Sequence, residues 1–231
     1  MRWREICRLL LSLPAALALA IVVYLPGEAG VLLRRAYYRW RFKACGENLR
    51  VLPGVHITGH HLIEVGDDVT IRENAIINTS LPLADEQREL RWVGARGRIN
   101  RGVVRIGSHS RIAFGALILG YGGVIIGEKC GVGPGAILLS ETFHHSGSDR
   151  SRIYKYSQGA AAEEQCVAQG TVELQDGAGI ASHALVLPGA LIGRDAWVAP
   201  NSVVRPGGNV PAMAVVKGDP AVPVFRRGLA E

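Results

Sequence analysis

The sequence predicts an all-β fold, a parallel β-helix of short strands, that follows a helical segment associated with a membrane. Three observations predict it: a six-residue repeat of aliphatic residues, a composition rich in glycine, and an uncharged apolar run near the N-terminus. We expect the membrane-associated segment over residues 1–48, the β-helix over residues 49–220, and a C-terminal cap or tail over residues 221–231.

The composition favours short strands joined by tight turns. The 231 residues include 29 glycines but only four phenylalanines, and 48% of them are hydrophobic. That apolar fraction excludes a disordered chain, and glycine combined with small and β-branched residues is typical of short strands and turns. The length fits one domain with an appendage.

Charge and cysteine content exclude two classes of partner. Residues 1–43 hold eight basic and two acidic residues and so carry the whole net charge of +6, which leaves the remainder neutral. A neutral body offers no basic patch to nucleic acid. The cysteines lie far apart with no C-x-x-C pair, so we expect neither a zinc site nor a disulfide framework, but reduced thiols in a cytosolic setting. They are Cys7, Cys45, Cys130 and Cys166.

The N-terminal segment contains an uncharged and mostly apolar run, residues 9–25, with basic residues on both sides. This run is at the short end for a spanning helix, which needs about 20 residues. Three interpretations stay open: a re-entrant or interfacial helical hairpin that turns at Pro26-Gly27, a single spanning helix, or a cleaved signal peptide. The basic and aromatic residues of 34–43 suit the headgroup layer of a bilayer. We expect attachment to the cytoplasmic face of the inner membrane through residues 1–43.

An aliphatic residue recurs at every sixth position in the C-terminal half, and the residue four places later is small. The aliphatic positions are Leu174, Ile180, Val186, Ile192, Val198, Val204, Val210 and Val216, and the small ones are Ala178, Ala184, Ala190, Ala196, Ser202, Gly208 and Ala214. The same spacing holds upstream for Ile106, Ile112, Ile118, Ile126, Val132 and Leu138, with one longer step, of eight, between Ile118 and Ile126.

A six-residue period fits neither an α-helix nor a hairpin meander, whereas a coil of three short strands, each one period long, satisfies it. The aliphatic side chains then point inward and stack coil on coil, and the small residues fit tight corners. The glycines within residues 120–123 predict a two-residue bulge at the longer step. Because backbone hydrogen bonds run between coils, the end coils need caps, which we expect from the N-terminal segment and from the tail around Pro220 and Pro223.

Residues 50–227 resemble the hexapeptide-repeat acyltransferases, both in the repeat and in the closing run Val216-Lys217-Gly218-Asp219-Pro220-Ala221, which matches the V-x-G-x-P-A motif of that family. The resemblance implies a left-handed parallel β-helix, a homotrimer, and an acyl-CoA such as acetyl-CoA as co-substrate. The hand and the trimer come from the resemblance alone, because periodicity fixes neither. One departure is Gly179, where relatives carry a tryptophan that adjoins the CoA site.

Two insertions interrupt the repeat, at residues 80–101 and 141–171, and insertions commonly carry function in a solenoid. The first holds five arginines among acidic residues. It is either a solvated loop or an arm that touches an anionic acceptor or a neighbouring subunit.

The second insertion contains the adjacent histidines His144 and His145. In the sugar and polysaccharide acetyltransferases that the chain resembles, a histidine at this point acts as general base. Imidazole suits this role because its pKa of about 6.5 leaves it neutral at pH 7. We expect His144 or His145 to be the base, with Glu141 or Asp149 orienting the ring.

The other site residues also follow from the resemblance. CoA lies, in that family, in the groove between neighbouring β-helices. This places backbone contacts at Ser182 and Ala199, phosphate contacts at Lys217, Arg226 and Arg227, and a sugar hydroxyl near Asn78. We expect no metal site, because a zinc-dependent β-helix enzyme would need three convergent imidazoles and the sequence offers no such set.

We therefore expect an O-acetyltransferase of polysaccharide biosynthesis. It would move an acetyl group from acetyl-CoA to a hydroxyl of a saccharide or lipid-linked saccharide, by direct attack in a ternary complex. Two alternatives stay open: an N-acyltransferase that acts on an amino sugar or amino acid, and a non-catalytic membrane-bound β-helix scaffold.

Overall fold

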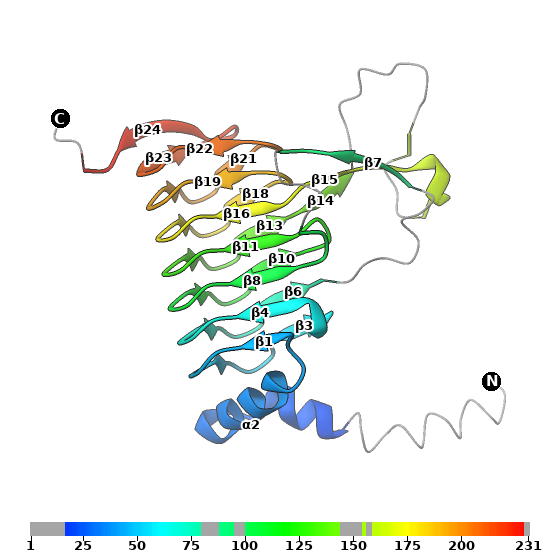
Figure 1. Cartoon of the computed structure of the whole chain (residues 1–231), viewed down its shortest axis with the longest axis vertical. Coiled ribbons are helices and arrows are strands. Elements are labelled where there is room, and N and C mark those ends of the chain that lie inside the picture. Colours follow the sequence, from blue (N-terminus) through cyan, green and yellow to red (C-terminus); the bar gives the residue numbers. More distant parts are fainter. Residues whose placement is uncertain (1–16, 80–87, 95–99, 144–153, 156–158, 229–231) are drawn as a thin grey trace.

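The computed structural model describes residues 17–79, 88–94, 100–143, 154–155 and 159–228. Three parallel sheets form the walls of a column, and the chain winds through them in order from one end of the column to the other (Figure 1). A fourth, smaller sheet projects from one side. The described part of the chain is therefore a parallel β-helix with a side extension.

The strands of the three walls are short, mostly two or three residues each. The first sheet contains, in spatial order, β1 (Ala44–Cys45), β4 (Ile63–Val65), β8 (Val104–Ile106), β11 (Val124–Ile126), β16 (Val172–Leu174), β19 (Leu191–Ile192) and β22 (Asn209–Val210). The second contains β2 (Arg50–Val51), β5 (Thr70–Ile71), β9 (Arg111–Ile112), β12 (Gly131–Val132), β17 (Gly179–Ile180), β20 (Trp197–Val198), β23 (Ala214–Lys217) and β24 (Val222–Arg226). The third contains β3 (His56–Thr58), β6 (Ile76–Asn78), β10 (Leu117–Leu119), β13 (Ile137–Leu139), β18 (Leu185–Val186) and β21 (Val203–Val204).

The strand registers give the length of each coil. Glu173 in β16 pairs with Leu191 in β19, and the two positions are three six-residue steps apart, which confirms the predicted coil. Val104 in β8 pairs with Val124 in β11, which makes this coil longer than three steps by the two residues that the glycines of 120–123 predict. The coil length therefore follows the repeat in the sequence.

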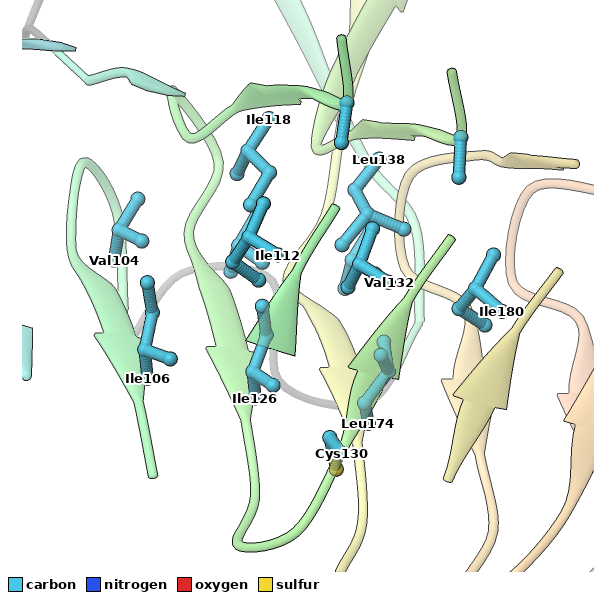
Figure 2. Close-up of a cluster of buried hydrophobic side chains, with 14 of the residues drawn as sticks. Val104, Ile106, Ile112, Ile118, Ile126, Cys130, Val132, Leu138, Leu174 and Ile180 are labelled. Atoms are coloured by element: carbon cyan, nitrogen blue, oxygen red, sulfur yellow. The ribbon is translucent and has the colours of Figure 1, made fainter. Parts of the chain in front are cut away.

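The core is the stack of inward aliphatic residues that the repeat predicts. Ile126 pairs with Ile106 on one side and with Leu174 on the other, and all three are buried (Figure 2). Val132 lies in the same way between its neighbours on the second wall. Stacking like side chains on successive coils removes nearly their whole apolar surface from water, which is the main stabilising contribution in such a column.

The two ends of the column are covered by different structures. The helix α2 (Gly27–Arg39) lies across the base, below β1, and packs against β2 (Figure 1). At the other end the tail folds back as β24, which pairs antiparallel with β23. Both arrangements shield backbone groups that an open end of the column would expose.

Within residues 17–79, 88–94, 100–143, 154–155 and 159–228, no single helix is long and apolar enough to cross a membrane. Leu17–Tyr24 and Gly27–Arg39 pass that length and composition test only as a pair, and they are bent by 119° at the break between them. The bend lies where the sequence predicts a turn at Pro26-Gly27.

The two insertions meet in the small side sheet. It consists of β14 (Glu141–Phe143), β15 (Cys166–Gln169) and β7 (Glu89–Trp92), with β15 in the middle. β15 runs antiparallel to β14 and parallel to β7, and all four of its residues are buried. Two short 3-10 turns, His60–Leu62 and Ala162–Glu164, complete the described elements.

Candidate active site

Both insertions leave the column at the same corner. Thr58, Asn78, Leu119 and Leu139 end successive strands of the third wall and are aligned in register. The first insertion begins just after Asn78, and the second begins just after Leu139. Residues far apart in the sequence are thus brought together at one edge of the β-helix.

Buried hydroxyl groups hold this corner where the chain departs. Ser140 Oγ donates to the Leu119 carbonyl at 2.6 Å and accepts from the Gly122 N–H at 2.8 Å. Thr79 Oγ1 donates to the Gly102 carbonyl, which joins the start of the first insertion to its return. The sequence analysis did not single out these residues, although a hydroxyl side chain at the last position before each break is a usable signal.

The side sheet fixes polar groups beside the corner. Gln169 Nε2 donates to Glu141 Oε2, so a carboxylate that the sequence suggests as an orienting group has a defined partner. Glu89 accepts from the Tyr154 hydroxyl and forms an ion pair with Arg91 at 3.2 Å. A carboxylate held by such bonds keeps one position, which orienting a neighbouring ring requires.

The candidate bases His144 and His145 lie outside the described residues, as does Asp149. Phe143, the last residue of β14, precedes them directly. The last described residue before them therefore lies in the side sheet, on the strand that follows Ser140.

Asn78 lies at this corner as well. It ends β6 and is half-buried, and its Oδ1 accepts a hydrogen bond from Thr58 Oγ1 at 2.5 Å. Thr58 occupies the equivalent position one coil below. The hydroxyl of Thr58 holds the Asn78 amide in a fixed orientation, which a residue that reads a sugar hydroxyl would need.

Ser182 and Ala199 lie at a different corner, after the strands of the second wall. Ser182 follows β17, and Ala199 follows β20 on the next coil. The Ser182 carbonyl accepts from the Asn201 N–H at 3.1 Å, and the Ala199 N–H donates to the Val216 carbonyl at 2.9 Å. Since the third wall separates this corner from that of Asn78, one chain does not bring the two predicted groups together.

An open pocket of about 360 Å³ lies on the outer face of the second wall, at the C-terminal end of the column. Trp197, Val215, Phe225 and Arg227 line it. The Arg227 guanidinium donates to the Asp195 carbonyl at 3.1 Å, which holds it beside the two rings. Of the three cations expected to contact phosphate, Arg227 lines this pocket, whereas Lys217 and Arg226 are exposed at the ends of β23 and β24.

Trp197 accounts for the departure at Gly179. Gly179 pairs with Trp197 on the next coil, and a methyl group at position 179 would lie only 2.9 Å from Trp197 Cδ1. The indole ring therefore leans over the space that the missing side chain leaves. The sequence analysis missed both Trp197 and Phe225, although Trp197 is a large aromatic residue at an outward position of the repeat; Phe225 lies in the tail beyond the repeat.

The described residues contain no group of three or more His, Cys, Asp or Glu side chains that could hold a metal ion. Their three cysteines, Cys45, Cys130 and Cys166, are free thiols. Burial raises the pKa of Cys130 to about 11, so this thiol stays protonated and unreactive at neutral pH.

Sequence comparisons gave no match, either to a protein-family model or to a curated protein. Solved structures do match the fold. AntD, an N-acyltransferase from Bacillus cereus, is 18% identical in a variant complexed with dTDP and coenzyme A; the match covers 85% of this chain and 89% of that one, with a TM-score of 0.67. A complex of AntD with dTDP and 3-hydroxybutyryl-CoA gives a TM-score of 0.65 at 19% identity, covering 84% and 88% of the two chains.

A hexapeptide-repeat acetyltransferase from Vibrio cholerae, complexed with acetyl-CoA, is 19% identical over 89% of this chain and 81% of its own, with a TM-score of 0.50. These neighbours share the column of short parallel strands and differ widely in sequence. The chain therefore has the fold of the hexapeptide-repeat acyltransferases.

Proposed function

We propose that this protein is an acyl-CoA-dependent acyltransferase that moves an acetyl group from acetyl-CoA to a hydroxyl of a saccharide or lipid-linked saccharide. One observation carries the proposal: both insertions leave the β-helix at the corner of Asn78, and the second carries His144 and His145 directly after β14. The structural neighbours that bind coenzyme A or acetyl-CoA support the same reaction class.

The chemistry assigns each group a role. His144 or His145 removes the proton of the acceptor hydroxyl while its oxygen attacks the thioester carbonyl carbon. The carbonyl oxygen becomes an oxyanion that backbone N–H groups stabilise, and the C–S bond then breaks. The CoA thiolate leaves and takes up the proton that the imidazole removed, so the products are the acyl ester and the free thiol and the histidine is neutral again. Glu141, which accepts a hydrogen bond from Gln169, would orient the imidazole ring in this proposal.

The pocket at the C-terminal end suits the nucleotide part of CoA. The rings of Trp197 and Phe225 offer apolar surface to a purine, and the Arg227 guanidinium offers charge to a phosphate. From there the pantetheine arm would run along the column past Ala199 and Ser182, which lie on successive coils at the nearby corner. Lys217 and Arg226, both exposed, are further phosphate contacts in this proposal.

The separation of the two corners favours assembly of several copies. The acceptor side, with Asn78 and the second insertion, lies after the third wall, and the cofactor side, with Ser182 and Ala199, lies after the second. A second copy that places its second-wall corner against the third-wall corner of the first would complete the site. A homotrimer does this three times with one interface, because a three-fold ring closes on itself.

N-acylation is the second candidate, because the AntD neighbours are N-acyltransferases and two further AntD variants were solved with dTDP-4-amino-4,6-dideoxyglucose. An amine acceptor fits the same general-base mechanism, since an ammonium group must also lose a proton before it attacks. Asn78 can accept from an amine or donate to a hydroxyl, so its chemistry does not distinguish the two.

A thiol-release assay on the full-length protein distinguishes these functions. Acetyl-CoA is offered with a panel of saccharides and with matched amino sugars, and free CoA thiol is measured. Release with the saccharides supports O-transfer, and release with the amino sugars alone supports N-transfer. If no acceptor in either set raises the rate above hydrolysis, and acetyl-CoA does not bind, the non-catalytic scaffold is correct.

A further inference from the structure

We infer that the underside of the N-terminal helix pair, residues 17–43, is a rigid seat for an anionic phospholipid leaflet, and that the β-helix stands on it with its coils stacked away from the bilayer. The helix pair lies at the base of the column, on the side away from the C-terminal pocket (Figure 1). Four features of the described residues support this.

The helix pair is locked to the β-helix by one buried arginine. Arg34 is fully buried; its Nε donates to the Val51 carbonyl at 2.6 Å, and its Nη1 donates to the carbonyls of Val22 at 3.1 Å and Leu25 at 2.8 Å. One guanidinium thus joins the end of the first helix, α2 and strand β2. Because a buried charge is costly unless it is well hydrogen-bonded, this arrangement requires both helices.

A second set of bonds supports the lock. The Gly54 N–H donates to the Val23 carbonyl at 3.0 Å, and Arg35 Nε donates to the Leu49 carbonyl at 2.9 Å. Removal of residues 17–25 would take away three of the four carbonyl acceptors of Arg34, those of Val22, Val23 and Leu25. These contacts favour a retained helical hairpin over a cleaved signal peptide.

The side of the pair that faces away from the column is apolar and exposed. In α2 the buried side chains Val31, Arg34 and Tyr38 face the column, whereas Leu32, Leu33 and Ala36 are exposed. The large apolar side chains that are exposed on the helix pair and just after it are Leu17, Leu19, Ile21, Tyr24, Leu25, Leu32, Leu33 and Trp40. Trp40 is 91% exposed. So many large apolar side chains exposed close together mark an interaction site.

Charge and aromatic character select a lipid surface as the partner. The exposed Arg39 and Arg41 flank Trp40, and the Arg41 guanidinium lies 4.4 Å from the centre of the Tyr37 ring. Lys43, the next cation along the chain, forms an ion pair with Glu64 at 2.7 Å. The acidic residue of α2, Glu28, forms an ion pair with Arg50 at 2.8 Å. Tryptophan and tyrosine prefer the headgroup layer, and nearby arginines attract anionic lipids. The bend of 119° lets both helices lie in the interface without crossing it.

With the helix pair on the leaflet, the acceptor corner lies at a set height above the lipid headgroups. If the proposed function is correct, a lipid-linked acceptor must span that height. β13, which leads into the second insertion, is the third strand beyond β3 in its wall, and neighbouring strands lie about 4.8 Å apart. With about 10 Å for the helix layer, the acceptor corner extends from roughly 15 Å above the leaflet, at Asn78 on β6, to roughly 25 Å, at the end of β13. A lipid-linked acceptor would bridge that distance with its saccharide portion, so an oligosaccharide fits better than a single sugar next to the lipid.

Vesicle flotation of the full-length protein tests the seat. The vesicles contain phosphatidylcholine with phosphatidylglycerol, or phosphatidylcholine alone. We expect Leu32→Glu and Trp40→Ala each to weaken binding about tenfold or more, since each removes a large apolar side chain from the interface. Arg39→Gln should weaken binding about fivefold on the anionic vesicles and leave binding to the neutral ones unchanged. Phe114→Ala, which removes an exposed aromatic ring from the side of the column, should change nothing.

Tryptophan quenching provides a test without loss of binding. In a Trp3→Phe background, brominated lipids should quench the emission that Trp40→Phe removes, whereas the remaining emission, of Trp92 and Trp197, should be quenched much less. If Leu32→Glu and Trp40→Ala float as native protein does, the seat is wrong. The seat is also wrong if Leu32→Glu and Trp40→Ala leave flotation unchanged and instead convert an oligomer in detergent to a smaller species. In that case a second copy of the chain covers this face. Neither assay involves acyl-CoA, so the seat and the acyltransferase proposal can fail separately.

Discussion

The substitution Gly94→Ala should release the first insertion from the column without unfolding the column. Gly94 follows β7 with a φ of +78°, and a Cβ atom at this position would lie 2.5 Å from the Gly189 carbonyl oxygen. Gly189 belongs to the corner between β18 and β19, and Val93 donates to the Gln169 carbonyl at 2.8 Å, so neither side can give way easily. The close approach of two glycines is therefore what seats β7 beside the column.

The magnitude has two parts. An alanine in the left-handed region costs about 1–2 kcal/mol wherever it occurs. At position 94 the added methyl also needs roughly 1 Å of extra space to reach an ordinary contact of about 3.5 Å, and overpacking of this kind costs about 1–3 kcal/mol. Gly115→Ala is the matched control, because Gly115 has a φ of +64° and open space around its Cβ position.

Hydrogen exchange followed by mass spectrometry measures the outcome. In Gly94→Ala protein the amides of β7 and β15 should lose protection by about tenfold to a hundredfold more than in Gly115→Ala protein, which is the overpacking cost expressed as a ratio. The walls of the column should keep their protection. Two results would refute the close-approach reasoning. One is an equal loss of amide protection in β7 and β15 in the two variants, and the other is a loss of protection over the whole chain in Gly94→Ala alone.

Three further changes test the base, the core and the lock. His144→Ala or His145→Ala should lower turnover by about 10²–10⁴-fold with unchanged acetyl-CoA affinity, and full turnover in both single variants and the double variant would exclude a histidine base. Ile180→Ala should destabilise the column by about 2–5 kcal/mol in thermal unfolding, because Ile180 is 2% exposed in the stack, and an unchanged midpoint would contradict that packing. Arg34→Met should cost about 3–5 kcal/mol and raise protease cleavage within residues 17–25, since the carbonyls of Val22, Leu25 and Val51 lose their donor; resistance equal to native protein would show that the lock is unnecessary.

The β-helix could be predicted from the sequence because each coil repeats the same local requirement. Every inward position needs an aliphatic side chain of similar size, so Leu174, Ile180 and Val186 show the period directly, and all three are buried. The longer step after Ile118 marks the longer coil for the same reason. The hand of the coil is not readable in this way, since the six-residue period is the same for either hand.

The side sheet could not be predicted, because nothing local specifies it. Leu90 in β7 pairs with Val167 in β15, which is distant in the sequence, and neither strand belongs to the repeat. Residues 80–101 were expected to form either a solvated loop or an arm. The solvated loop does not describe β7, because β7 is a strand paired with β15. The contact between Gly94 and Gly189 requires glycine at both positions. With 29 glycines in the sequence, however, nothing distinguishes these two from the others.

The roles of the candidate site residues stay predictions, because His144 and His145 lie outside the described residues. The structure adds that Asn78 and the start of the second insertion share a corner. Trp197 and Phe225 were not foreseen, because the strand that carries Phe225 folds back on the column and only that contact forms the pocket with Arg227.

Calorimetric titration of the detergent-solubilised full-length protein with acetyl-CoA tests the central claim most directly, because it requires no knowledge of the acceptor. We expect saturable binding that Arg227→Ala weakens about tenfold or more, through loss of a charge-assisted phosphate contact, and that His144→Ala leaves unchanged. Absence of binding by acetyl-CoA and by longer acyl-CoAs would contradict the acyltransferase proposal and leave the β-helix as a scaffold.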